Sequence, residues 1–266
     1  METTRRQTLF ASLAAAGGLS AMSQPLSGCA ASDDASSSCL TQLPVLGAIH
    51  SNHRDSEAYS LEVLARAIRR AEPDLVLTEI PPSRLVEAKR SFAETGAVTE
   101  ARTKVFPELT DVVFPLSQEL GFEIVACAGW SQEIADNRRA ALKAIENDPA
   151  RAKEWAAYRL ARAEYQRTIT KARRDDPRFI HTRDYDVLVQ RAQTPYQIYF
   201  DRDLGPGGWT QINAAHTGLI DAALDTISGR GQHALIVFGA WHKYMIERAL
   251  SLRSDISLRD PLPLFA

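Results

Sequence analysis

The chain has 266 residues, in which 31 lysine and arginine residues are balanced by 33 aspartate and glutamate residues, so its formal net charge is −2. This balance gives no whole-molecule signature of nucleic-acid binding, and no nucleic-acid partner is expected. Hydrophobic residues make up 45% and charged residues 24%, proportions typical of a globular domain, and three cysteines are too few for a disulfide scaffold.

The first predicted element is an export signal over residues 1–28. An arginine pair precedes an apolar stretch from Leu9 to Leu19, which is too short for a permanent membrane anchor and resembles a twin-arginine signal. The segment Leu26–Cys29 resembles a bacterial lipobox, in which the cysteine is lipidated and becomes the mature N-terminus. The sequence therefore predicts an exported lipoprotein, anchored to a membrane of the cell envelope at Cys29. The alternative is a plain secretory signal in which Cys29 has no role.

The rest of the chain is predicted to form a flexible tether over residues 29–41 and a single domain over residues 42–266. Short apolar segments, bounded by turn residues, have the length of buried strands. The segments predicted as strands are 43–50, 74–80, 122–128 and 233–240. Segments with helical spacing of apolar residues lie between them. This alternation predicts an α/β fold with a mainly parallel sheet flanked by helices.

Residues 129–232 connect the third predicted strand to the fourth, and they have an almost wholly helical pattern as far as the turn-rich segment 204–208. Connections of this length usually carry a function or form a subdomain. We therefore predict that a helical insertion, about residues 131–205, lies as a lid over the carboxyl end of the sheet.

Three polar residues follow predicted strands: His50 ends the first, Glu79 lies near the end of the second, and His242 comes directly after the fourth. Because the carboxyl ends of parallel strands form the ligand crevice of open α/β sheets, these side chains are expected to meet there. Both histidines end a Gly-x-x-His motif, 47–50 and 239–242. Two histidines and a carboxylate can hold one divalent metal ion, whose identity the sequence leaves open. Alternatively, Glu79 orients a histidine that activates water without a metal.

The paired motifs, with the segment LVLTE on the strand between them, resemble the Tiki/TraB/GumN and erythromycin-esterase/ChaN-like superfamily. The resemblance covers residues 50–82 and 233–250. It implies a hydrolase-like α/β catalytic domain and places His50, Glu79 and His242 at family site positions. Some members are metal-dependent peptidases, others are esterases without an evident metal, and many have no assigned activity.

The chain departs from that family pattern at two places. Erythromycin-esterase and ChaN-like members have a glutamate directly after the first motif's glycine, where this chain has Ala48. The family also tends to carry an arginine on the helix before the last strand, whereas residues 209–221 contain none. Arg202, just upstream, and His216, on that helix, are the candidate substitutes and substrate-binding residues. His53, three residues after the first site histidine, is a third substrate-binding candidate or else an exposed loop histidine.

These observations predict an exported lipoprotein with a hydrolase-type site, either a metal-dependent peptidase or an esterase, acting on a peptide or small-molecule substrate. The alternative from another class is a non-enzymatic lipoprotein that binds a ligand in the same crevice. The two hypotheses differ in whether the histidine pair binds a metal and turns over a substrate.

Overall fold

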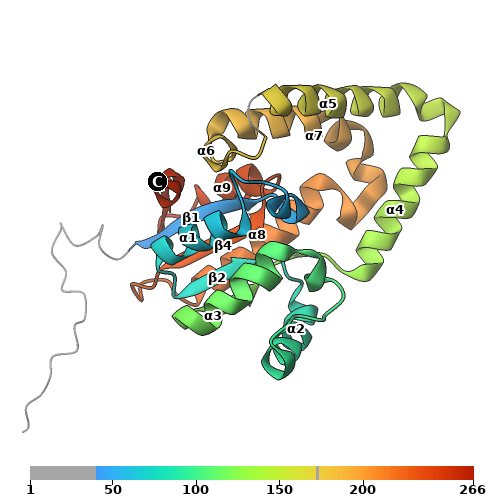
Figure 1. Cartoon of the computed structure of the whole chain (residues 1–266). Coiled ribbons are helices and arrows are strands. Elements are labelled where there is room, and N and C mark those ends of the chain that lie inside the picture. Colours follow the sequence, from blue (N-terminus) through green and yellow to red (C-terminus); the bar gives the residue numbers. More distant parts are fainter. Residues whose placement is uncertain (1–39, 172–173) are drawn as a thin grey trace, which may run out of the picture.

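The computed structural model describes residues 40–171 and 174–266, and they form an α/β fold (Figure 1). The predicted export signal, the lipidation site Cys29 and the tether as far as residue 39 lie outside the described residues. Thr41, the last residue of the predicted tether, begins the first strand. No helix in the described part of the chain is both long and apolar enough to cross a membrane.

The sheet contains five parallel strands in the order β3-β2-β4-β1-β5. Their bounds are β1 (Thr41–Ala48), β2 (Leu75–Thr78), β3 (Glu123–Ala126), β4 (Ala234–Gly239) and β5 (Ile256–Arg259). The four predicted strands are confirmed with small shifts of their ends, and β5 is an additional edge strand. Because β4 pairs with both β1 and β2, the three strands that carry the predicted site residues are neighbours.

Helices cover both faces of the sheet, which explains why every residue of β2 and β4 is buried. Leu235 and Val237 on β4 pack in the core that α1 and α3 cover, whereas Ile236 and Phe238 pack beneath α8 and α9. The helices are α1 (Leu61–Ala71), α2 (Pro82–Thr95), α3 (Phe114–Leu120), α4 (Gln132–Asn147), α5 (Ala152–Lys171), α6 (Pro177–Ile180), α7 (Arg183–Leu204), α8 (Trp209–Asp225) and α9 (Lys243–Leu250).

The predicted lid is confirmed as a set of long helices, α4, α5 and α7, between β3 and β4 (Figure 1). Helices α5 and α7 are held together by aromatic side chains: Trp155 and Tyr158 on α5 contact Phe200 on α7, with ring centroids 5.7 Å apart in both pairs. The face of α5 that carries Tyr165 lines the same cavity as the residues that follow β1 and β4. The lid therefore covers the carboxyl edge of the sheet.

Candidate active site

The predicted site residues meet at the carboxyl edge of the sheet. The Oε1 atom of Glu79 lies 3.9 Å from Nε2 of His242. The ideal position of a Cβ at Gly239 lies 2.6 Å from Nε2 of His50 and 3.1 Å from Oε2 of Glu79. A side chain at Gly239 would therefore displace both groups, and this explains the glycine of the second Gly-x-x-His motif. The structure therefore brings His50, Glu79 and His242 together at this edge of the sheet.

Backbone geometry fixes two of these side chains. Glu79 follows β2, and its Oε2 accepts a hydrogen bond from the N–H of Gly239 at the end of the neighbouring strand β4, over 2.9 Å. His50 follows β1 with a φ of 52°, a left-handed conformation that residues with a side chain seldom adopt. Strained conformations of this kind cluster at functional sites, where the surrounding structure holds them in place.

His50 is held by Glu108, a buried residue that begins a π-helical turn (Glu108–Val113) ahead of α3. The Nδ1–H of His50 donates to Oε1 of Glu108 over 2.6 Å. Burial lowers the pKa of His50, but the hydrogen bond to Glu108 and the negative charges of Glu79 and Glu108 outweigh this effect and raise the pKa to about 9. The raised pKa favours the protonated form of His50 at neutral pH. The second oxygen of Glu108, Oε2, is buried and has no hydrogen-bond partner among the described residues.

His242 presents a free lone pair to Glu79. Its Nδ1–H donates to Oδ1 of Asn213 over 2.8 Å, and the amide of Asn213 is oriented by its own donation to the carbonyl of Trp209. The ring of Trp209 stacks on His242 with centroids 4.7 Å apart. Burial, aided by the positive charges of His50 and Arg138, lowers the pKa of His242 to about 3. The ring is therefore neutral, and its Nε2 is an acceptor or a ligand.

His216, on α8, presents a proton instead. Its Nδ1 accepts a hydrogen bond from the backbone N–H of Gly129 over 2.8 Å, so the single proton of the neutral ring sits on Nε2. Burial is the main cause that lowers the pKa of His216 to about 3, against the opposing effect of the negative charge of Glu79, so the ring stays neutral. This Nε2–H is buried and has no partner among the described residues. An unpaired buried donor is costly, so this N–H requires an explanation.

The donor atoms partly fit a metal ion. Ligand atoms of Glu79, His216 and His242 all lie within 4.8 Å of one another, so the described residues contain a group that can hold a metal. Hydrogen bonding refines this set, because a histidine nitrogen that carries a proton cannot coordinate. His242 offers an unprotonated Nε2 and has the Nδ1–H···O contact usual for metal-bound histidine, whereas His216 has its proton on Nε2. His50 is oriented in the same way by Glu108, but it lies outside the 4.8 Å group and has to lose a proton before it can bind.

A cavity of about 390 Å³ opens above His50 and His242, whereas Glu79 and His216 lie behind its lining. Its floor is formed by the strand ends, and its walls come from the lid and from two tryptophans near His242. The lining residues include His50, Gly239, His242, Arg162, Tyr165, Ile169, Trp209 and Trp241. The volume lies within the range of small-molecule sites.

Two predicted substrate-binding residues lie elsewhere. His53 is only 1% exposed, because its Nε2 accepts from the N–H of Ile49 and its Nδ1–H donates to the carbonyl of Tyr59. Both ring nitrogens are thus used to hold the loop after β1, so the structure supports neither a substrate contact nor an exposed loop histidine. Arg202 is exposed on α7 and does not line the cavity. His216 lies beside Glu79 and His242, but it is fully buried and does not line the cavity.

The sequence prediction missed Glu108 and Asn213, the residues that orient the two motif histidines. Glu108 is an acidic residue directly before a buried apolar pair, Leu109 with Val112, which is a weak signal of a buried carboxylate. It also supplies a carboxylate to His50 that Ala48 cannot supply. Comparison of the chain with known proteins found no matching family model, curated protein or solved structure. The site must therefore be interpreted from its own geometry.

Proposed function

We propose that the protein is an exported, lipid-anchored hydrolase that uses one divalent metal ion, and that it resembles the Tiki/TraB/GumN and erythromycin-esterase/ChaN-like superfamily in its chemistry. The observation that carries this proposal is that two acceptor groups, on His242 and Glu79, lie beside a hydrogen-bond donor on His216. Nε2 of His242 lies 3.9 Å from Oε1 of Glu79, a ring nitrogen of His216 lies within 4.8 Å of both groups, and the Nε2–H of His216 has no partner among the described residues. Metal-dependent hydrolysis of a peptide or ester bond needs acceptor groups that bind a cation and a donor that binds the carbonyl oxygen of the substrate.

We assign Glu79 and His242 as the fixed ligands and His50 as the third. A bound divalent ion would lower the pKa of a water molecule and polarise a substrate carbonyl. The described side chains supply the remainder. His216 donates its Nε2–H to the substrate oxygen as negative charge develops there, while Asn213 and Glu108 keep the two motif histidines in the binding tautomer.

Metal titration tests this assignment. Isothermal calorimetry with Zn²⁺ and with Mn²⁺ at pH 7.5 should give one site per chain. The Glu79→Gln and His242→Ala variants should lose this site, and the His216→Gln variant should keep it. His233→Ala is the matched control, because His233 is exposed at the opposite end of β4. Absence of stoichiometric binding in the unaltered protein would refute the metal, whereas loss of binding in His216→Gln would show that His216 is a ligand after all.

A metal-free hydrolase is the second candidate, because the raised pKa of His50 favours an ion pair with Glu79 and Glu108 over a metal. In that case His50 keeps its proton and acts as an acid, while Glu79 accepts a proton from water. Activity toward a panel of chromogenic esters and short peptides should then survive dialysis against a chelator. The metal-dependent proposal requires that activity be lost on dialysis and restored by added metal.

The cellular location is a separate proposal and depends on Cys29. We expect the full-length protein to partition with membranes after cell fractionation, and the Cys29→Ser variant to be released into the soluble fraction. Full-length protein found in the cytoplasm would contradict the export signal, and a Cys29→Ser variant that behaves like the unaltered protein would favour the plain secretory alternative.

A further inference from the structure

The lid contributes a cation to the cavity that the proposed chemistry does not use. Arg162 on α5 is partly buried and lines the cavity above the strand ends. In the ranges 40–171 and 174–266, no carboxylate lies within ion-pair distance of its guanidinium, whose recorded contact is with the ring of Trp241. A partly buried guanidinium without an acidic partner retains its full capacity to bind an anion.

The guanidinium is held in position rather than free to move. Its Cζ lies 4.2 Å from the centroid of the Trp241 ring, a cation–π contact. The Trp241 ring is fixed in turn, because its Nε1–H donates to the hydroxyl of Tyr165 over 3.1 Å. Tyr165 lies three residues after Arg162 on the same face of α5. Since Trp241 directly precedes His242, this wall places a fixed positive charge beside the proposed reaction centre.

The charge balance of the cavity favours a carboxylate as the anion. Arg174 and Asp175 also line the cavity, but their charges offset each other. The other polar side chains of the lining are Asn52, Gln166 and the two histidines, so Asp175 is its only carboxylate and Arg162 meets an anion with little competition from acidic groups. A guanidinium binds a planar carboxylate through two parallel hydrogen bonds. A phosphate with two negative charges would be repelled more strongly by the carboxylates of Glu79 and Glu108 below it.

We propose that Arg162 binds a free carboxylate of the substrate, so that the hydrolase acts on acylated amino acids or short peptides, at an amide bond one or two residues from that carboxylate. This inference rests on the proposed hydrolase function. The cavity of about 390 Å³ has room for a substrate of that length. Water supplies the hydroxyl group that joins the acyl carbon and the proton that joins the leaving nitrogen, so the reaction needs no further reactant.

Equilibrium binding tests the carboxylate site independently of turnover. The probes are 3-phenylpropanoate and its uncharged analogue 3-phenylpropanamide, titrated into the full mature chain by calorimetry. We expect the carboxylate to bind at least about 10-fold more tightly than the amide, as expected for a hydrogen bond to a charged group. Arg162→Gln should abolish this preference. Arg159→Gln, at an exposed position one turn earlier on α5, should retain it.

Kinetics with the metal-loaded protein then separates the two proposals. N-benzoyl-glycyl-phenylalanine should be hydrolysed with a KM at least about 10-fold below that of its C-terminal amide, and Arg162→Gln should raise the KM of the acid only. Equal affinity for the two calorimetric probes, or a preference that survives Arg162→Gln, overturns the carboxylate site. A preference for the carboxylate without turnover of either peptide supports the site and contradicts the hydrolase.

Discussion

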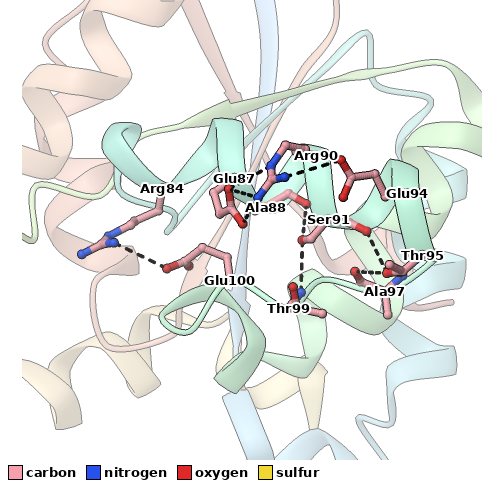
Figure 2. A network of polar contacts seen from close by, with 10 residues as sticks. All are labelled: Arg84, Glu87, Ala88, Arg90, Ser91, Glu94, Thr95, Ala97, Thr99 and Glu100. Atoms are coloured by element: carbon pink, nitrogen blue, oxygen red, sulfur yellow. Dashed lines mark hydrogen bonds and ion pairs between the residues drawn. The ribbon is translucent and has the colours of Figure 1, made fainter.

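Two buried carboxylates eight positions apart show how the polar groups of a scaffold differ from those of a site. Glu100, beyond the end of α2, belongs to the polar network of Figure 2, where Arg84 approaches it to 3.9 Å. Its Oε2 also accepts hydrogen bonds from the backbone of Arg102 and from the backbone and hydroxyl of Thr103. Burial raises the pKa of Glu100, but these hydrogen bonds outweigh it and leave the pKa lowered. Glu108 is equally buried, yet its Oε2 has no partner among the described residues.

The histidines divide in the same way. Both ring nitrogens of His53 and of His181 are hydrogen-bonded to backbone groups, so these rings join segments of the chain. His216 and His242 each use only Nδ1, which bonds the backbone N–H of Gly129 in His216 and the side chain of Asn213 in His242, and Nε2 of His216 has no partner among the described residues. Buried polar groups whose hydrogen bonds are all made stabilise the fold, whereas a buried group with an unpaired donor or acceptor marks a place where a ligand can bind. The following predictions test this division.

The largest expected effect is that of His242→Ala. The buried ring makes one side-chain hydrogen bond, to Asn213, and stacks on Trp209, so its loss should lower the melting temperature but leave the chain folded. It should remove the proposed ligand and reduce turnover by at least about 1,000-fold. Steady-state kinetics and thermal denaturation measured on the same preparation check both parts. A large drop in melting temperature, with activity lost only in proportion to the unfolded fraction, would assign His242 to the scaffold.

Substitution of His216 should have the next largest effect and should act on the rate alone. Loss of one hydrogen-bond donor to a developing oxyanion reduces turnover by about 100-fold in other hydrolases, and His216→Phe should approach this figure. His216→Gln, which retains an N–H donor, should recover part of the rate. Both variants are expected to bind metal with unchanged stoichiometry. A rise in KM at constant kcat would instead indicate a role in ground-state binding.

Substitution of Glu100, the hydrogen-bonded carboxylate, should affect stability and not turnover. Glu100→Gln removes the negative charge that supports three hydrogen bonds, so we expect the free energy of unfolding to fall by about 1–2 kcal/mol, with turnover unchanged. Urea denaturation at pH 7 measures the first quantity. Glu108→Gln is the paired comparison, because it should reduce turnover more than stability. If both substitutions affected only stability, the unpaired oxygen of Glu108 would have no functional meaning.

The sequence predicts where the site lies but not which ring nitrogen of each histidine carries the proton. The Gly-x-x-His motifs and the segment around Glu79 identify three strand ends, and the parallel topology then brings them together. The short edge strand β5 was missed, because Ile256–Arg259 is only partly buried and lacks a long apolar run. Glu108 was missed because its role depends on a π-helical turn, which has the same apolar spacing as an ordinary helix.

Histidine was the least predictable residue type. His53 was a candidate because of its spacing from His50, and His216 because it lies on the helix before the last strand; in the structure both ring nitrogens of His53 are bonded to backbone groups, whereas Nε2 of His216 has no partner among the described residues. The difference depends on backbone groups. The N–H of Gly129, which is distant in the sequence, donates to His216, and the C=O of Tyr59, in a local turn, accepts from His53. Tertiary hydrogen bonding decides which nitrogen carries the proton, and a sequence pattern does not contain that information.

The smallest expected effect is a pH dependence of stability from His181, a histidine whose two ring nitrogens are both hydrogen-bonded to backbone groups. Its Nε2 accepts from the N–H of Gly47 and its Nδ1–H donates to the carbonyl of Pro177. Burial lowers its pKa from the ordinary 6.5 to about 3. The unfolded chain therefore binds a proton between these values and the folded chain does not, so this contribution is fully present above pH 6.5 and decreases as the pH falls. Between pH 7 and pH 5.5 the expected loss is about 1 kcal/mol. The His181→Gln variant retains an acceptor for Gly47. Between pH 7 and pH 5.5, its free energy of unfolding, measured by urea denaturation, should therefore fall by about 1 kcal/mol less than that of the unaltered chain. Identical losses in the two proteins would mean that His181 is not held neutral by the fold.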